Sequence, residues 1–326
     1  MTGDFFLTQW AFLGMRWLYE ALTNESIVLT VIIATLLIRS LTIFGDIKSR
    51  KSSMQMQAIQ PQLQKIQKKY EKDPQRLNIE QRKLMKDNNV SMFGGCLPML
   101  LTLPIFFIFI AAFRQWGYEM MVKLIVIMDS DPEAGLELFK SFKFLWVNNL
   151  WAADNGFKPV VMQASEFFSA SMAQLPKLIY FKDNPAALET FVRLGFFVPK
   201  DGGYAMATLT DAITSEYNTL LAPCMNLYPG QNNGWFIFPI IAGGTTFLVS
   251  WMSMRNQPKN DAAGSTGKIM QYMMPVMTAW FCLSMNTTFA LYWTISNVFS
   301  IISTYFINKS FEKSGALAPV TEDSKK

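Results

Sequence analysis

The sequence predicts an all-α, polytopic membrane protein with five transmembrane helices and a cytoplasmic helical hairpin. Apolar residues make up 51% of the 326 residues and charged residues only 16%, whereas charged residues account for roughly 25% of a soluble domain. The apolar residues also form uninterrupted runs of about 18 residues or more, the length of helix that crosses a bilayer. A long polar stretch with apolar positions at helical spacing separates the first two runs.

The segment before the first run, residues 1–26, is expected to lie outside and on the membrane surface. Within it, Phe5–Leu22 carries apolar and aromatic residues at roughly helical spacing, but Gln9, Arg16 and Glu20 interrupt them. This pattern favours an interfacial amphipathic helix over a transmembrane one. A poorly ordered leader is the alternative. No small-residue cleavage site follows, so neither a secretory signal nor a transit peptide is expected.

Five apolar runs are assigned as spans, and the polar segments between them as loops. No internal repeat is evident, which weakens the interpretation as an inverted-repeat transporter. The spans are Ile27–Phe44, Cys96–Phe113, Trp235–Met254, Ile269–Met285 and Phe289–Ile307; the loops are Gly45–Gly95, Arg114–Gly234 and Arg255–Lys268, and the tail covers residues 308–326.

The distribution of basic residues predicts the orientation. Gly45–Gly95 holds eleven basic and five acidic residues, whereas Arg114–Gly234 holds nine basic and twelve acidic ones. Loops rich in Lys and Arg stay in the cytoplasm. We therefore expect the first loop, the loop Arg255–Lys268 and the C-terminus in the cytoplasm, with the N-terminus and Arg114–Gly234 outside.

The first loop is predicted to form two helices. Ile47–Tyr70 carries an apolar stripe at helical spacing, and Asp73-Pro74 then supplies a helix cap and a residue suited to the first helical turn. Leu77–Asn88 continues as the second helix. An ordinary solvated helical pair is one interpretation; the other is a basic, Met-bearing surface that meets polypeptide, ribosome or lipid head groups. The stripe consists of Met56, Ile59, Leu63 and Ile66.

The composition argues against an enzyme or a metalloprotein. The chain has no histidine, which excludes Ser-His-Asp and Cys-His triads and zinc sites that need histidine. The three cysteines, Cys96, Cys224 and Cys282, show no paired spacing, so neither a disulfide framework nor a metal site is indicated. We expect no cofactor, no metal and no catalytic activity.

Arg39 is the thirteenth residue of the first span. At 1.5 Å per residue it lies about 18 Å from the outer end. An arginine there costs roughly 2.5–3.5 kcal/mol and keeps its proton. It must therefore reach the inner interface, pair with an acid or line a wet cavity. None of the five assigned spans contains Asp or Glu, so pairing inside the membrane is not expected.

Other polar residues of the spans could line such a cavity with Arg39. Thr35 lies four residues earlier and therefore on the same helical face. Each of these residues alone is more often a helix–helix hydrogen bond; together they suggest a hydrophilic vestibule. The other candidates are Thr102 in the second span and Thr294, Ser296 and Asn297 in the fifth.

Several motifs carry a resemblance to a known family. They are TLLIRSLTI around Arg39, SMQMQAIQPQLQKIQKKYEKDPQRLNIEQRKLMKDNNV, GGCLPMLLTLPIFF, FLWVNNLW, MQYMMPVMTAWF and ALYWTISNVFSIISTYFI. In this order they resemble the YidC membrane insertases, the bacterial relatives of the mitochondrial Oxa-type and chloroplast Albino-type proteins. The resemblance covers about Trp17–Trp151 and Trp235–Lys309.

The resemblance implies an insertase and folding chaperone that works without nucleotide. Its five-helix core would hold a groove open to the cytoplasm and closed outside, where Arg39 attracts the hydrophilic N-terminal stretch of a client. The client's apolar segment would slide along the third and fifth spans. By match, Thr35 and Trp293 contact clients; Thr102, Tyr292, Ser296 and Asn297 complete the implied groove.

The implied partners are nascent membrane proteins and the lipid bilayer of a bacterial plasma membrane, with a single-membrane envelope expected. The Sec translocon and the ribosome are further suggested partners, although a tail with four lysines against three acids does not favour a strong ribosome anchor. Direct sequence-specific binding of nucleic acid is not expected.

The sequence also departs from the family pattern. Thr102-Leu103 stands where relatives carry Gln before the second proline, which weakens Thr102 as a groove residue. Ser91-Met92 replaces Asn-Pro, and Asn286–Thr288 replaces a Pro/Gly turn. Gly156–Gly234 resembles an outside insertion that the family core lacks, either a docking surface or a lid. A small-solute transporter or channel, or a scaffold that binds through this insertion, are the alternative functions.

Overall fold

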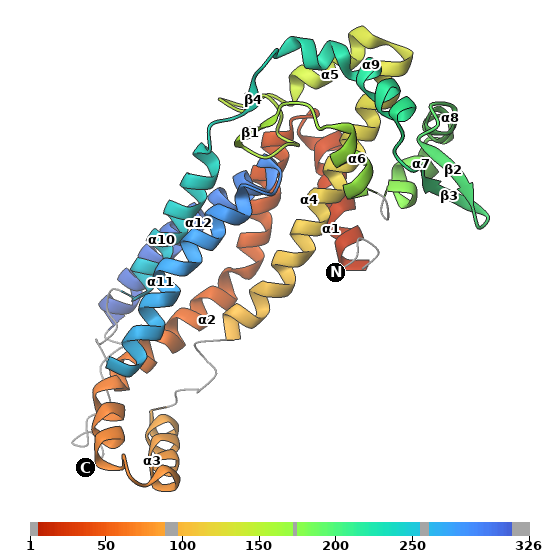
Figure 1. The fold of residues 1–326 in the computed structure, drawn as a ribbon. Coiled ribbons are helices and arrows are strands. Elements are labelled where there is room, and N and C mark those ends of the chain that lie inside the picture. The colour runs from red at the N-terminus through yellow and green to blue at the C-terminus, as the bar shows by residue number, and fades with distance from the viewer. Residues whose placement is uncertain (1–5, 89–96, 172–174, 255–260, 315–326) are drawn as a thin grey trace. The chain divides into compact units, whose positions relative to one another are not determined.

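The structure is a computed structural model that describes residues 6–88, 97–171, 175–254 and 261–314. These residues are mostly helical (Figure 1). Among them, three helical stretches are long and apolar enough to cross a membrane, namely Ile27–Met56, Pro104–Ser130 and Thr287–Phe311, and Ile237–Ser253 is a shorter apolar helix. The chain is thus a multi-pass membrane protein, and the count of five spans stays a prediction.

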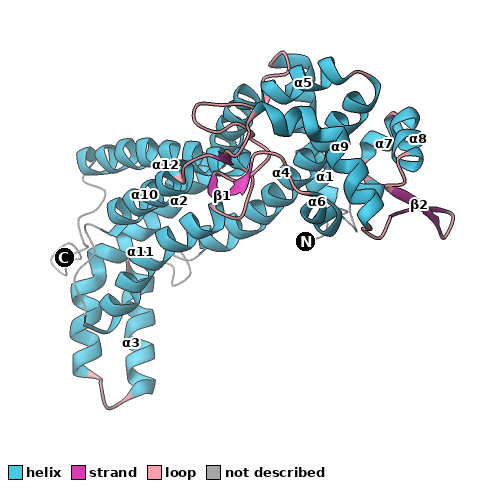
Figure 2. Cartoon of the chain, turned by 45° about the horizontal axis from the view of Figure 1, so that its top comes forward, coloured by secondary structure: helices cyan, strands magenta, loops and turns pink. Residues whose placement is uncertain are grey.

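The elements follow one another along the chain as drawn in Figures 1 and 2. The helices are α1 (Phe6–Trp17), α2 (Ile27–Lys69), α3 (Pro74–Asp87), α4 (Leu97–Ser130), α5 (Pro132–Ser141), α6 (Ala164–Ser171), α7 (Ile179–Asp183), α8 (Pro185–Arg193), α9 (Asp211–Leu227), α10 (Ile237–Met254), α11 (Asp261–Cys282) and α12 (Thr287–Ser314), with a π-helical segment at Leu18–Leu22 and a short 3₁₀ turn at Leu175–Lys177. The strands are β1 (Asn155–Pro159), β2 (Phe197–Lys200), β3 (Gly203–Met206) and β4 (Asn232–Asn233).

The chain divides into two compact units. The first unit comprises Met1–Ala34, Phe107–Ala242 and Thr278–Thr294, and the second comprises Thr35–Phe106, Gly243–Met277 and Ile295–Lys326. Each unit therefore combines segments that are far apart in the sequence.

The first unit has a core of aromatic side chains. Phe168 packs edge-on against Phe196, with ring centroids 5.3 Å apart and planes at 89°, an arrangement that aromatic rings favour. Much of this core comes from the described residues of the segment 156–234. The fully buried aromatic residues are Phe12, Phe113, Trp116, Phe139, Phe142, Phe167, Phe168, Phe191, Phe196, Phe197, Tyr217 and Phe289.

Two small antiparallel sheets depart from the all-α prediction. In one, β1 pairs with β4, and Asn155 stands opposite Asn233. In the other, β2 and β3 form a hairpin around Asp201 and Gly202, both with positive φ, as a two-residue hairpin turn requires. The pairing of β1 with β4 brings the two ends of the segment 156–234 together.

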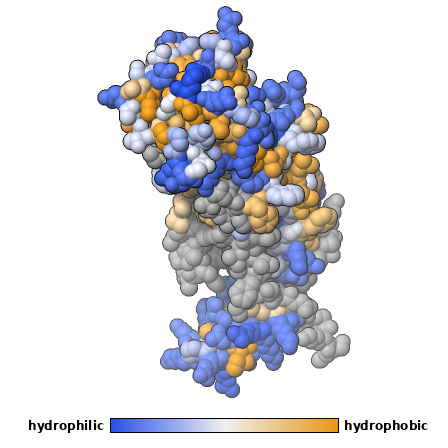
Figure 3. All heavy atoms as spheres, turned by 90° about the vertical axis from the view of Figure 1, so that its right-hand side faces the viewer, coloured by the Kyte–Doolittle hydropathy of each residue, from blue (hydrophilic) through white to orange (hydrophobic). Residues whose placement is uncertain are grey.

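The second unit contains the predicted pair of helices, formed by the end of α2 and by α3. Ile59 and Leu63 are buried, and Met56, Leu84 and Met85 pack against them. The cap prediction is confirmed: the Asp73 side chain accepts a hydrogen bond from the backbone N–H of Arg76, and Pro74 opens α3. Hydrophilic side chains gather over the tip of this pair, at the bottom of Figure 3. Its cytoplasmic location stays a prediction.

α2 is longer than the sequence predicted. It runs unbroken from Ile27 to Lys69, through Gly45, where the first span was expected to end. One helix thus contains both the first apolar run and the first half of the predicted hairpin. This continuity decides which residues lie on the same face as Arg39.

Candidate functional site

Arg39 is bonded to α12 inside the second unit. Its Nε donates to the Ser296 hydroxyl oxygen over 2.6 Å, and its Nη2 donates to the same oxygen. The Arg39 side chain is 22% exposed, and Ser296 is buried. A neutral hydroxyl is thus the principal described partner of the guanidinium.

An acidic residue from beyond the assigned span also lies near Arg39, whereas the sequence analysis considered only acids within the spans. Asp46 Oδ2 is 4.0 Å from Arg39 Nη1. Asp46 lies beyond the assigned span, but α2 continues through it, and residues seven apart in a helix return to the same face. At this separation the two groups form a loose ion pair rather than a short charge-assisted hydrogen bond.

Asn297 and Thr35 are two further predicted site residues of the second unit. The Asn297 amide donates to the hydroxyl oxygens of Thr245 over 3.0 Å and Thr246 over 2.9 Å, joining α12 to α10. This is the helix–helix hydrogen bond that was the alternative to a groove role. Thr35 is buried and lies one helical turn before Arg39.

The other predicted site residues are placed differently. Tyr292 belongs to the first unit and is buried, with its ring stacked on Phe109 at 5.3 Å and 12°. Trp293, half-buried in the same unit, has its ring 5.9 Å from that of Phe289. Thr102 lies in α4, but its side chain is outside the described residues. The structure therefore brings Arg39 together with Ser296, and places Tyr292 in an aromatic cluster.

Arg50 is a site residue that the sequence analysis missed. Its Nε donates to Asn308 Oδ1 over 2.9 Å, and its terminal nitrogens donate to the backbone carbonyls of Met252 and Ser253 over 3.2 and 3.4 Å. These carbonyls belong to the last turn of α10, where a cation is favoured by the helix dipole. Had one unbroken helix been predicted, Arg50 would have been a candidate, because positions 39, 46 and 50 share one helical face.

The second unit therefore holds two arginines and one acid on one face of α2. Arg39 and Arg50 carry two positive charges against the single negative charge of Asp46, so these three groups have a net positive charge. Among the described residues, no group of three or more His, Cys, Asp and Glu is placed to hold a metal ion. The chemistry that this face offers is electrostatic attraction and hydrogen bonding.

The sequence matches the family model described as 60Kd inner membrane protein over residues 17–199 and 204–314. The chain belongs to this family, the YidC family. The matched ranges carry the Arg39 face, both helices of the pair and most of the segment Gly156–Gly234. The predicted resemblance is thereby confirmed.

Curated members of the YidC family align with parts of the chain. The proteins named Membrane protein insertase YidC from Clostridium perfringens and Clostridium tetani are each 34% identical, over 44% and 45% of this chain and 52% and 57% of their own length. The protein of the same name from Pelodictyon phaeoclathratiforme is 23% identical over 90% of this chain and 35% of its own. The chain thus spans between about a third and just over half of the length of these relatives.

Proposed function

We propose that the chain is a membrane protein insertase and folding chaperone, working without nucleotide in a bacterial plasma membrane. Its relatives bear the name Membrane protein insertase YidC, which supports the proposal. The clients are nascent membrane proteins with an apolar segment and a short hydrophilic flank. In this account the N-terminus lies outside and the C-terminus in the cytoplasm, and the Sec translocon and the ribosome are candidate partners.

The observation that carries this proposal is the set of contacts that the Arg39 guanidinium makes. The guanidinium is held by the neutral Ser296 hydroxyl, and its carboxylate neighbour Asp46 stays 4.0 Å away. A guanidinium with a short bidentate carboxylate partner would already be satisfied. Arg39 instead keeps a positive charge that a client's acidic or polar flank can approach.

The favourable and the unfavourable contributions to the free energy of insertion come from different parts of the client. Burying about 20 apolar residues in the bilayer is strongly favourable without any added energy source. The unfavourable step is moving the polar flank through an apolar layer. A cationic, hydrogen-bonding face within an apolar helix lowers that barrier because it replaces part of the water the flank loses. Arg39, Ser296 and Thr35 are the proposed residues of this face.

The proposal is tested by insertion into vesicles that contain only the purified protein. A single-span client with a short acidic N-terminal tail is synthesised in vitro, and its protected fragments after protease digestion are measured. Arg39→Ala and Arg39→Glu should each reduce insertion, with Arg39→Glu reducing it more because it repels the tail. Arg39→Lys should retain most of the activity because the charge is kept.

The matched control is Arg82→Ala, which removes an arginine from an exposed position on α3. It should insert this client like the parent chain, because Arg82 is an exposed residue of α3 and not part of the Arg39 face. Normal insertion by both Arg39→Ala and Arg39→Glu would overturn the role of the charge. Substrate-dependent solute flux through the same vesicles would instead favour a transporter.

The scaffold alternative can be separated from an insertase through the folded segment 156–234. Because Pro159 pairs with Asn232, residues 161–231 can be replaced by a short Gly-Ser linker that keeps this pairing. Asn233 is also kept, since its amide bonds the carbonyls of Asn149 and Ala153. An insertase should keep measurable insertion after this deletion, whereas a scaffold should lose its partner.

A further inference from the structure

Large apolar side chains are exposed in the first unit where β1 meets the start of α10. Phe157 of β1 is 84% exposed, Trp235 is 73% exposed, and Ile240 in the first turns of α10 is 66% exposed. Phe236 is half-buried, and its ring centroid lies 5.1 Å from that of Phe157. These four residues are called the aromatic patch. A contiguous apolar patch, unlike a single exposed residue, indicates an interaction surface.

A buried carboxylate fixes the backbone of the aromatic patch. Asp154 Oδ1 accepts from the backbone N–H groups of Trp235 over 2.7 Å and of Phe236 over 3.0 Å. These bonds hold Phe236 at a φ of 63°, which a bulky residue rarely adopts. A Cβ atom at Gly156 would lie 2.6 Å from the Phe236 ring, so only glycine lets β1 pass this close. The exposed rings are therefore presented by a firmly held backbone.

The segment that leads into the patch is bonded to the ends of three helices. Thr287, the first residue of α12, donates from its N–H and its hydroxyl to the Ala152 carbonyl over 2.9 and 2.8 Å. The Asn155 amide donates over 3.2 Å to the carbonyl of Leu283, directly after α11. Asp154 bonds the start of α10. Residues 152–155 thus lie at the level where α10 and α12 begin and α11 ends.

The length of α12 places this level at a membrane surface. Its stretch Thr287–Phe311 has 25 residues and is apolar enough to cross a membrane. At 1.5 Å per residue this stretch measures about 37 Å, more than the hydrocarbon core of about 30 Å. A crossing helix of this length has its ends among the lipid head groups. Trp280, in the last turn of α11, is 63% exposed, and tryptophan is enriched at that depth.

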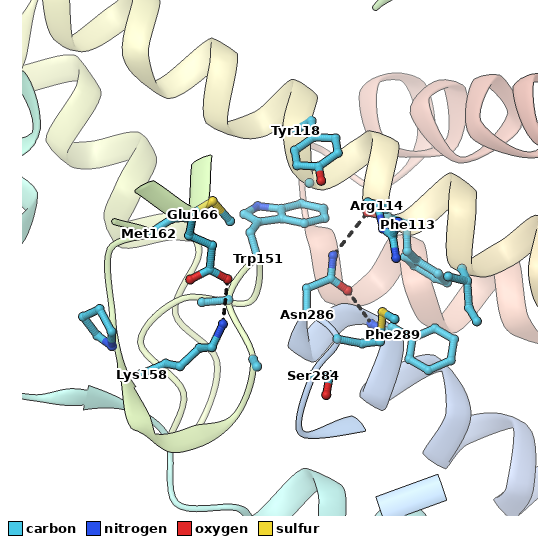
Figure 4. Close-up of a pocket in the computed structure, with 16 residues that line it drawn as sticks. Phe113, Arg114, Tyr118, Trp151, Lys158, Met162, Glu166, Ser284, Asn286 and Phe289 are labelled. Carbon is cyan, nitrogen blue, oxygen red and sulfur yellow. Dashed lines mark hydrogen bonds and ion pairs between the residues drawn. The ribbon is translucent and has the colours of Figure 1, made fainter. Parts of the chain in front are cut away.

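The charges nearest to the patch in the sequence are compensated. Lys158, which follows Phe157, has its Nζ 2.7 Å from Glu166 Oε1, and Figure 4 shows this pair. Asp154 is fully buried, and both its oxygens accept hydrogen bonds. These charges therefore give a charged partner no reason to bind at the patch. The interfacial zone of a bilayer, in contrast, favours aromatic side chains.

We propose that the aromatic patch inserts into the interfacial zone of the lipid bilayer and anchors the segment 156–234 there through Phe157. Because β1 pairs with β4, the anchor holds both ends of the segment at the membrane surface. Tyr204, also exposed, belongs to the hairpin of β2 and β3 and stays in water. The inference depends on the chain being a multi-pass membrane protein and not on the proposed insertase activity.

The test locates single side chains of the full chain in lipid nanodiscs that hold one copy each. The probe para-trifluoromethylphenylalanine replaces Phe157, Trp235 or Tyr204, one position at a time. Fluorine NMR then measures line broadening by a phospholipid spin-labelled near its head group and by a water-soluble gadolinium chelate. At positions 157 and 235 the lipid label should broaden the signal several-fold more than the chelate does. At position 204, the matched exposed aromatic control, the order should be reversed.

The probe at position 157 adds only a trifluoromethyl group to an exposed phenyl ring, so the fold should be kept, and an unchanged melting temperature checks this. Stronger broadening by the chelate at position 157 would overturn the proposal. A signal there that neither agent broadens would also overturn it, because protein would then cover the patch. Equal broadening by the lipid label at positions 157 and 204 would refute an anchor located at β1.

Discussion

The Nε of Arg39 lies 2.6 Å from the hydroxyl oxygen of Ser296, which joins two residues 257 positions apart in the chain. α2 and α12 are thereby connected through a neutral acceptor, and the positive charge is retained. The charge is fixed in place by a partner that does not cancel it.

Ser296→Ala should reduce insertion of a short-tailed client, but less than Arg39→Ala does. The variant keeps the charge and removes the hydroxyl that orients it, and a hydrogen bond to a charged group contributes about 1.5–3 kcal/mol. Insertion into vesicles measures the effect. The control is Ser300→Ala, one turn later, where the hydroxyl donates to the Ser296 carbonyl within its own helix. An equal effect of both serine variants would contradict the prediction.

Arg50→Ala should lower the thermal stability of the purified chain. The change removes one hydrogen bond to Asn308 and two to the carbonyls at the end of α10, a loss of about 2 kcal/mol in the free energy of unfolding. Arg50→Lys should recover only part of it, because an ammonium cannot reproduce the fork of a guanidinium. Lys48→Ala, at an exposed position of α2, should leave the melting temperature unchanged; an equal loss there would count against the account.

Asp154→Asn should destabilise the start of α10. Asp154 is fully buried, and its two oxygens accept from the backbone N–H groups of Trp235, Phe236 and Phe238 and from the Trp146 indole. An amide nitrogen in place of one oxygen would face only donors, at a cost of roughly 3 kcal/mol or more.

Thermal unfolding of Asp154→Asn in detergent measures this cost. The control makes the same substitution at Asp201, an exposed residue in the turn between β2 and β3. Asp201→Asn should melt like the parent, because asparagine also tolerates a positive φ. The same melting temperature for parent and Asp154→Asn would refute the role assigned to this carboxylate.

Cys224 should resist alkylation while the chain is folded. Burial raises the pKa of the Cys224 thiol to about 12 from an ordinary value of 9.0, and only the thiolate reacts. At pH 8 the rate with maleimide, followed by peptide mass spectrometry, should be at least about 100-fold lower than after unfolding. Equal rates in the two states would contradict the burial of this residue.

The same group makes stability depend on alkaline pH. The folded chain keeps the thiol proton up to about pH 12, whereas the unfolded chain releases it near pH 9. The unfolded state therefore binds fewer protons in this window, and stability falls as pH rises. The contribution of Cys224 is fully present below pH 9 and is lost as pH approaches 12. Cys224→Ala should flatten this part of the pH profile.

The sequence predicted the features of the fold that depend on local spacing better than the features that depend on long-range contacts. The Asp73-Pro74 cap and the apolar positions Met56, Ile59 and Leu63 follow from helical spacing and capping chemistry alone. The first span was assigned to Ile27–Phe44 from its apolar run, and α2 continues beyond it to Lys69. The assigned span therefore did not include Asp46 and Arg50, which share a face with Arg39 in the unbroken helix.

Other features depended on contacts that spacing cannot reveal. The pairing of β1 with β4 joins short segments about 80 residues apart, and neither is apolar enough to predict a strand. The hairpin of β2 and β3 did leave a signal, since Asp201-Gly202 is a preferred two-residue turn. The contacts of Tyr292 with Phe109 and Phe113 in an aromatic cluster could not be read from spacing either, and its groove role stays a prediction.

The central claim, that the Arg39 face receives the polar flank of a client, is tested most directly by site-specific photocrosslinking to a stalled nascent membrane protein. A photoreactive residue at position 43 lies one turn from Arg39 on the same face and leaves Arg39 and Ser296 intact; position 41, which is 81% exposed, points to the opposite face. The account predicts crosslinks to the client's polar flank several-fold stronger from 43 than from 41, and their loss in Arg39→Gln. Equal crosslinking from both positions, or crosslinking that persists in Arg39→Gln, would contradict it.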